Sequence, residues 1–159
     1  MGTIAEWFDF DLIVQSLERI PDLEYFLIGP VMVNDPPVHE RIHYLGTVAH
    51  DNLFETIKEM DCMVMTFRLA DVVLAVDPVK LYEYISWQKN IITVDYPEIE
   101  RFEKFVQKYS NVDEYCCAVV KFGDCSEASY SERDAECFLA DNAWKNRVES
   151  IEKRIEELE

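Results

Sequence analysis

The sequence predicts one α/β domain, in which a parallel sheet is flanked by helices. Short apolar runs of strand length alternate along the chain with segments whose apolar residues recur every three or four positions. Strands that alternate with helices in this way are typical of a parallel sheet. The length of 159 residues and the hydrophobic content of 49% suit a single domain, residues 1–159, with a sizeable core.

The first half of the chain is expected to hold two helices between short strands. Residues 9–19 and 51–60 are assigned as helices because apolar residues recur on one face of each. Pro21 ends the first of them. The inward residues are Leu12, Ile13, Leu17 and Ile20 in the first helix and Leu53, Phe54 and Ile57 in the second. Strands are expected at Met1–Ile4, Tyr25–Ile28, Ile42–Leu45 and Cys62–Phe67, and loops at Val33–Glu40 and Arg68–Val76.

The second half is expected to be mostly helical. Helices are predicted over 77–88, 98–109, 131–140 and about 143–158, with strands at Ile91–Val94 and Cys117–Val120. The final helix has the clearest periodicity. Its apolar stripe consists of Trp144, Val148, Ile151, Ile155 and Leu158.

The helix that begins near Asp77 carries the residues with the most chemical interest. Asp77 is expected to cap it, and Pro78 suits the first helical position, where its missing N–H is not needed. Lys80 and Glu83 are three residues apart and share a face. Arg68 follows the preceding strand, so the helix start, a lysine and an arginine are expected to converge as an anion site. Ligands bind at this edge of open parallel sheets.

At these residues the sequence resembles a known family. It is similar to the C-terminal, donor-binding domain of bacterial glycosyltransferases of the two-Rossmann-domain (GT-B) type, nearest to the retaining family-four or group-1 enzymes of cell-surface polysaccharide synthesis. The resemblance covers nearly the whole chain and implies a Rossmann-like parallel sheet that forms one half of such an enzyme. The segments that carry it are TFR (66–68), DPVKLYEY (77–84), IITVD (91–95), GTIAEWFDFDLI (2–13), YFLIGPV (25–31), RIHYLGTVAHDNLFETIKEMD (41–61) and NAWKNRVESIE (142–152).

The resemblance implies a role for each candidate site residue. Glu83 would accept hydrogen bonds from the ribose hydroxyls of the donor nucleotide. Lys80 and Arg68, with the helix start at Pro78 and Val79, would meet the diphosphate. The loop of Gly2 and Thr3 would let the diphosphate approach the backbone, and Gly46, Thr47 and Val48 would lie near the nucleobase. The residues alone leave simpler alternatives open: an exposed ion pair for Glu83 and Lys80, a pairing of Arg68 with Asp71 or Asp77, and ordinary connections for both loops.

Two positions depart from the family pattern. A first glutamate, seven residues before Glu83, is replaced by Ala75, and Asp77 stands where asparagine is usual. Contacts to the sugar hydroxyls are therefore not assigned. No catalytic residue is named either, because the sequence offers no defensible base.

The expected substrate is a UDP- or GDP-sugar donor, with neither a permanent cofactor nor a metal. The chain begins near the end of the family's first strand, which suggests that an N-terminal acceptor-binding domain is missing and that this domain alone has little or no activity. A cytoplasmic location is expected, with peripheral contact at the inner face of the membrane in the full-length enzyme.

Composition excludes some other classes of function. Fifteen basic against 32 acidic residues give a net charge of −17, which repels nucleic acid. The five cysteines have no regular spacing and are expected to be reduced thiols, and the three histidines lack the spacing of zinc ligands.

Two alternative functions and one assembly remain open. The chain could be a non-catalytic nucleotide-binding or protein-interaction module, or a receiver-like signalling domain. The stripe on the final helix has spacing close to a coiled-coil seam, so a two-fold homodimer is expected, against the alternative that the stripe folds back on its own sheet.

Overall fold

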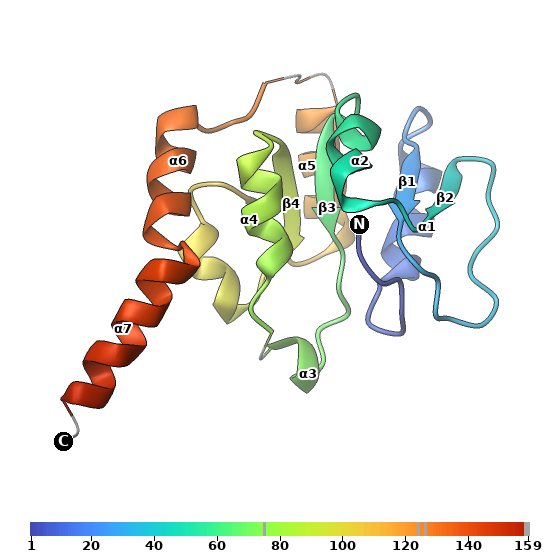
Figure 1. Cartoon of the computed structure of the whole chain (residues 1–159). Coiled ribbons are helices and arrows are strands. Elements are labelled where there is room, and N and C mark those ends of the chain that lie inside the picture. The colour runs from blue at the N-terminus through green and yellow to red at the C-terminus, as the bar shows by residue number, and fades with distance from the viewer. Residues whose placement is uncertain (75, 124, 126, 158–159) are drawn as a thin grey trace.

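The computed structural model describes residues 1–74, 76–123, 125 and 127–157 and has the predicted Rossmann-like α/β architecture (Figure 1). Its strands form two small parallel sheets. In one, β1 (Tyr25–Ile28) pairs with β2 (Ile42–Gly46). In the other, the order is β3 (Cys62–Met65), β4 (Asn90–Val94), β5 (Gln107–Tyr109). The fold class is therefore confirmed, although the single expected sheet is divided between β1 and β3.

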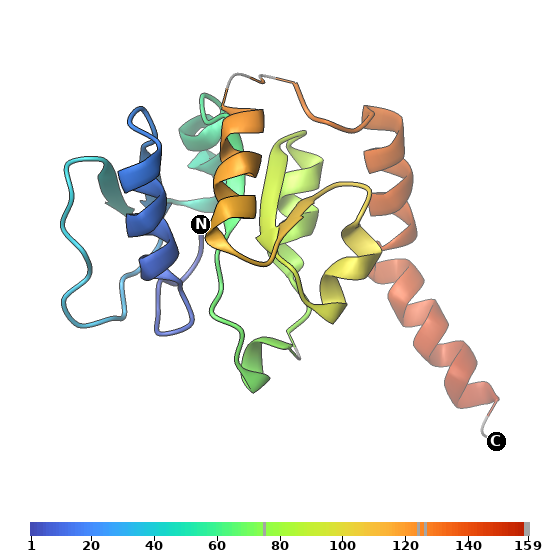
Figure 2. The ribbon, with the colours of Figure 1, turned by 180° about the vertical axis from the view of Figure 1, so that it is seen from behind.

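Helices cover both faces of these strands. The helices are α1 (Phe10–Arg19), α2 (His50–Ile57), α3 (Asp71–Leu74), α4 (Val79–Ser86), the 3-10 helix η1 (Pro97–Phe102), α5 (Val112–Phe122), α6 (Glu132–Asp141) and α7 (Trp144–Glu156). Figures 1 and 2 show α2 and α4 on one face and α1 and α5 on the opposite face. In both views α7 projects away from the rest of the molecule.

The first helix and strand follow directly from the sequence. The Asp9 carboxylate accepts a hydrogen bond from the Leu12 N–H at 3.1 Å, which satisfies one of the free donors at the start of α1. Leu12, Ile13 and Leu17 are buried as predicted, and β1 has the predicted bounds. The amphipathic pattern is thus sufficient to place α1 against the sheet.

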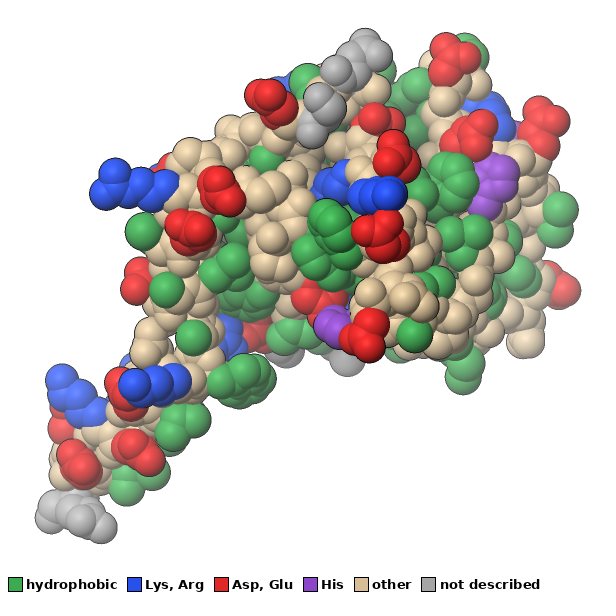
Figure 3. Space-filling model, turned by 45° about the horizontal axis from the view of Figure 1, so that its top comes forward, with side chains coloured by type: hydrophobic (Ala, Val, Ile, Leu, Met, Phe, Trp, Pro, Cys, Tyr) green, Lys and Arg blue, Asp and Glu red, His purple; other side chains and the backbone are tan. Residues whose placement is uncertain are grey.

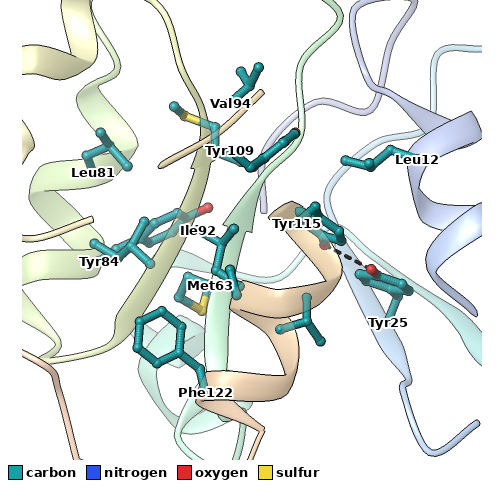
Figure 4. Packing of buried hydrophobic residues seen from close by; sticks show 14 of the residues in the cluster. Leu12, Tyr25, Met63, Leu81, Tyr84, Ile92, Val94, Tyr109, Tyr115 and Phe122 are labelled. Atoms are coloured by element: carbon teal, nitrogen blue, oxygen red, sulfur yellow. Dashed lines mark hydrogen bonds between the residues drawn. The ribbon is translucent and has the colours of Figure 1, made fainter. Parts of the chain in front are cut away.

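The core lies between the helices and the strands and contains several tyrosines (Figure 4). The hydroxyls of Ser16, Tyr25 and Tyr115 form a hydrogen-bonded chain, with oxygen distances of 2.7 and 2.8 Å. This chain joins α1, β1 and α5 and satisfies three buried polar groups. Burial raises the pKa of Tyr25 to about 12.

Two predictions in the second half of the chain are wrong. Cys117–Val120 is not a strand but part of α5, which starts where the Asn111 side chain accepts from the Glu114 N–H at 3.0 Å. Residues 98–109 are not one helix. The helix η1 ends at Phe102, and β5 follows beside β4, because Ile99, Phe102 and Phe105 are drawn into the core.

Smaller differences occur elsewhere. Phe54, expected inward, is 46% exposed, because Leu53 and Ile57, four residues apart, define the buried face of α2, and Phe54 lies beside that face. The segment predicted as the first strand forms a single parallel bridge, Ile4 with Val31. The expected loop after β3 contains the short helix α3.

The apolar stripe of α7 does not fold back on the sheet. Trp144 is 78% exposed, and Val148, Ile151 and Ile155 are between 48% and 59% exposed. Leu158, the last predicted member of the stripe, lies outside the described residues. Within the described part of the chain, no helix is both long and apolar enough to cross a membrane.

Candidate functional site

The predicted site lies at the carboxyl ends of the strands, on the edge where α3 is found (Figure 1). Gly29 directly follows β1, Gly46 is the last residue of β2, and α4 contributes Lys80 and Glu83. We call Gly2, Gly29, Gly46, Lys80 and Glu83 the carboxyl-edge site. Its backbone and charged groups come from segments far apart in the sequence.

Three glycines meet at this edge. Gly2, Gly29 and Gly46 have φ angles of 124°, 136° and 66°, a region that side chains disfavour. The Gly29 N–H donates to the Gly46 carbonyl at 2.7 Å, and the Gly2 N–H donates to the Ile28 carbonyl at 2.8 Å. A Cβ at Gly29 would lie 2.0 Å from the Gly2 carbonyl oxygen. Glycine is therefore required at position 29, and the predicted loops of Gly2 and Gly46 are joined through it.

Lys80 and Glu83 form an ion pair on α4. The Lys80 Nζ donates to both carboxylate oxygens of Glu83, at 3.0 and 3.2 Å. Their side chains are 38% and 31% exposed. An ion pair with this exposure contributes little to stability, so its two partners can be separated by a ligand at small cost. The structure thus confirms that the two residues share a face of α4, and it shows them bonded to each other.

The Met1 ammonium connects this ion pair to the glycines. It donates to the Tyr84 hydroxyl at 3.2 Å and lies close enough to Lys80 and Glu83 to feel both charges. Burial, helped by the charge of Lys80, lowers the pKa of this ammonium to about 6. At neutral pH this ammonium is therefore mostly uncharged.

Asp77 does not cap α4, contrary to the prediction. The N-cap residue is Pro78, and the Asp77 carboxylate instead pairs with Arg101 and, at 3.1 Å, with Arg147. Two guanidinium groups outcompete the backbone N–H groups for one carboxylate. The negative charge that Asp77 would bring to a phosphate is therefore neutralised.

Arg101 and Arg147 are the charged residues that sequence analysis missed. They come from η1 and α7, and no local pattern relates either to α4. The Arg147 guanidinium also donates to the Tyr82 hydroxyl at 2.7 Å. Hydrogen bonding to Asp77 raises the pKa of Arg147 above its already high value, so Arg147 stays charged.

Arg68 is held away from the Lys80–Glu83 pair. Its guanidinium lies 2.7 Å from the Asp11 carboxylate and 3.7 Å from that of Asp9. Neither Asp71 nor Asp77, the partners considered from the sequence, binds it in this structure. Arg68 lines a second cavity of about 510 Å³ with Glu6 and Asp35. The predicted convergence of Arg68 with Lys80 requires its release from these carboxylates.

The other predicted residues surround the edge without direct polar contacts of their own side chains. Val79 is 55% exposed at the start of α4, and Pro78 is buried beneath it. Thr3 and Thr47 are exposed, whereas Val48 packs against the core. Ala75, where the family pattern has a glutamate, lies outside the described residues.

The arrangement offers one carboxylate, one lysine and backbone groups in glycine loops, which suits a polyhydroxylated, anionic ligand. Within the described ranges, no group of three or more His, Cys, Asp or Glu side chains could hold a metal ion. The sequence matches no family model and no curated protein.

Proposed function

We propose that the chain is the nucleotide-sugar-binding domain of a glycosyltransferase. The donor is a UDP- or GDP-sugar, and the parent enzyme transfers the sugar to a glycan or a lipid-linked acceptor in surface polysaccharide synthesis. The observation that carries the proposal is the Lys80–Glu83 pair beside the Gly2–Gly29–Gly46 contact, at the carboxyl ends of parallel strands. The sequence resemblance to GT-B enzymes supports it.

In this proposal each group of the carboxyl-edge site has one task. Glu83 accepts hydrogen bonds from the vicinal ribose hydroxyls, and Lys80 turns from Glu83 to the diphosphate. Charge that develops on the departing diphosphate is stabilised by Lys80 and by backbone N–H groups at the edge. Arg68 adds a second cation once it leaves Asp11.

Transfer itself needs an acceptor site, which the resemblance assigns to a second domain. The chain alone is therefore expected to bind donor weakly and to have almost no transferase activity. The proposed location is cytoplasmic, with contact at the inner face of the membrane made by the whole enzyme.

Calorimetric titration with UDP, GDP, ADP and uridine tests the nucleotide site. Glu83→Ala should weaken binding of the preferred nucleoside diphosphate about tenfold or more, because a hydrogen bond to a charged group contributes roughly 1.5–3 kcal/mol. Glu136→Ala, an exposed glutamate on α6, is the matched control. Equal affinity of wild type and Glu83→Ala would remove Glu83 from the site.

The phosphate contacts have a separate test. Affinity should fall steeply from UDP to uridine and should also fall as salt is added, because exposed charges are screened. Lys80→Gln should abolish most of the difference between UDP and uridine. An affinity that depends neither on the phosphates nor on salt would contradict a phosphate site at this edge.

A second candidate is a non-catalytic nucleotide-binding or protein-interaction module. Both oxygens of Glu83 are occupied by Lys80, and Arg68 is occupied by Asp11, which favours this alternative. A thermal-shift panel with the nucleotides, and with magnesium plus an acyl-phosphate mimic, separates the classes. Stabilisation by the acyl phosphate alone would support the receiver-like alternative instead.

A further inference from the structure

The start of α4 offers a backbone donor although an aspartate precedes the helix. If Asp77 were the N-cap and Pro78 the first helical residue, the Asp77 carboxylate would accept from the N–H of Val79 or Lys80. The structure instead has Pro78 at the N-cap, and no side chain of the described residues caps α4. The Val79 N–H donates to the Asp77 carbonyl at 2.8 Å, and the Lys80 N–H has no hydrogen-bond partner among the described residues.

The Asp77 carboxylate is drawn away from this donor by two arginines. Its Oδ1 accepts from Arg101 of η1, and its Oδ2 accepts from Arg147 of α7 at 3.1 Å. Each carboxylate oxygen is thus bonded to a different guanidinium group. Hydrogen bonds between ionised groups are roughly twice as strong as those between neutral groups, so the arginines outcompete the backbone of α4 for this carboxylate.

Aromatic rings hold both guanidinium groups in position. The guanidinium of Arg101 lies 5.0 Å from the ring centroid of Phe102. That of Arg147 lies 5.2 Å from the ring of Tyr82 and 5.6 Å from the ring of Trp144. A planar guanidinium that is stacked in this way loses little further freedom when it binds a carboxylate. We call Arg101 and Arg147 the arginine clamp.

The charges around the arginine clamp balance when Asp77 is in place. Glu98 lies 3.9 Å from Arg101, on the same helix η1. The clamp therefore faces two carboxylates with its two positive charges. The Tyr96 hydroxyl lies close enough to Asp77 and Arg101 to feel both charges, and it is buried without a hydrogen-bond partner in the part of the chain that the structure describes. Departure of Asp77 would leave the clamp with Glu98 alone.

The second position open to the Asp77 carboxylate is the start of α4 itself. There it would accept from the Lys80 N–H, as a capping aspartate does. A phosphate and a carboxylate favour a helix start for the same reason, because both are anions. The capping position of Asp77 and a phosphate bound at Lys80 therefore exclude each other.

We propose that Arg101 and Arg147 are positioning residues, which hold the Asp77 carboxylate aside and keep the Lys80 N–H open to a diphosphate. This inference rests on the proposed nucleotide site and names the groups that keep it open. It also couples that site to α7, whose start lies beside η1 in both views (Figures 1 and 2). A diphosphate at Lys80 keeps Asp77 on the clamp, and release of Arg147 weakens the diphosphate by the same factor.

The first test needs no ligand and follows amide hydrogen exchange in the whole chain. The variant with Arg101→Gln and Arg147→Gln deprives Asp77 of both partners. Its Lys80 amide should exchange about tenfold more slowly, relative to the Ile85 amide of the same helix, because Asp77 then caps α4. Adding Asp77→Ala should restore the wild-type ratio. A Lys80 amide that is not slowed in the first variant overturns the proposal.

The second test is calorimetric titration with UDP, or with GDP if GDP binds more tightly. The variant with Arg101→Gln and Arg147→Gln should bind about tenfold more weakly, because the Asp77 carboxylate then occupies the helix start and repels the diphosphate. Asp77→Ala in this background should restore the affinity to within about threefold, and Asp77→Asn should restore less, because asparagine still caps a helix. Equal rescue by alanine and asparagine would contradict competition for the cap.

The matched control is Arg133→Gln with Arg154→Gln, which makes the same charge change on exposed parts of α6 and α7. It should leave both measurements unchanged. If it weakens UDP as much as the clamp variant does, net charge explains the loss and the proposal is overturned. If the wild type binds no nucleoside diphosphate, the proposed nucleotide site fails, and the exchange rate of the Lys80 amide still decides whether the clamp holds Asp77 off α4.

Discussion

The helices α4 and α7 each carry apolar residues on one face, but the two faces have opposite surroundings. In α4, Leu81, Tyr84 and Ile85 are at most 1% exposed, between the sheet and α6. In α7 no described residue is buried, and Figure 3 shows green side chains along its projecting length. Periodicity therefore predicts which residues share a face of a helix, whereas the tertiary structure decides whether anything covers that face.

The largest expected difference between the two helices concerns stability. Leu81→Ala should lower the free energy of unfolding by about 2–5 kcal/mol, because it leaves a cavity in a packed core. Ile151→Ala on α7 should change the free energy by no more than about 0.5 kcal/mol, as an exposed substitution does. Urea unfolding curves measure both. Similar losses for the two variants would mean that α7 is covered in solution.

Alkaline pH should destabilise the fold through Tyr84, which lies on α4. Burial raises the pKa of Tyr84, so the folded protein keeps the phenolic proton above pH 10, where an unfolded tyrosine loses it. The unfolded state then binds fewer protons, and stability falls as the pH rises above about 10. Tyr84→Phe should reduce this slope by up to about 1.4 kcal/mol per pH unit. An unchanged slope would show that Tyr84 is accessible to solvent.

A smaller effect is expected where α7 joins α4. Arg147 is bonded to Asp77 at 3.1 Å and to the Tyr82 hydroxyl at 2.7 Å, and its side chain is 29% exposed. Arg147→Ala should destabilise the fold by about 1 kcal/mol or less and should speed amide exchange in α7 more than in α4. Arg154→Ala, further along α7, is the control and should change neither quantity.

The smallest effect on the stability of the monomer is expected from a substitution in the apolar stripe of α7. We propose that α7 mediates a two-fold dimer, because a continuous apolar stripe is rarely left bare. Ile155→Glu should abolish self-association in light scattering and leave thermal stability of the monomer unchanged. Lys153→Gln makes the same change in net charge and should leave the dimer intact. A strictly monomeric wild type up to crystallisation-like concentrations would reject this role of the stripe.

Sequence analysis succeeded where local pattern and tertiary contact agree. For α1, one carboxylate at Asp9 and one apolar face fix both the start and the orientation of the helix. For α5 the sequence does carry a local signal: Asn111 caps the helix, and the Glu114 carboxylate accepts from the Ser110 N–H at 2.8 Å. The apolar run Cys117–Val120 predicts a strand, but within α5 only Ala118 and Val119 of this run are buried, and Cys117 and Val120 are exposed.

Other features depend on contacts that no local pattern reports. β5 is mostly polar and becomes a strand because β4 offers it a hydrogen-bonding edge. In the candidate site, the pairing of Lys80 with Glu83 follows from their spacing, so it was predictable. The pairing of Arg68 with Asp11 joins residues 57 positions apart, and the neutralisation of Asp77 needs two arginines from other elements.

The contact between Gly29 and Gly2 has a consequence for how this sequence can vary. A single methyl group at position 29 would act as a wedge, because it would meet the carbonyl oxygen of Gly2 at 2.0 Å. The wedge would lift residues 1–4 from the end of β1 and break the bond between Gly2 and Ile28. One substitution in a loop would thereby alter both the start of the chain and the carboxyl edge of the strands. Position 29 is thus a point at which one substitution would displace the segment of Gly2 and the end of β2 together.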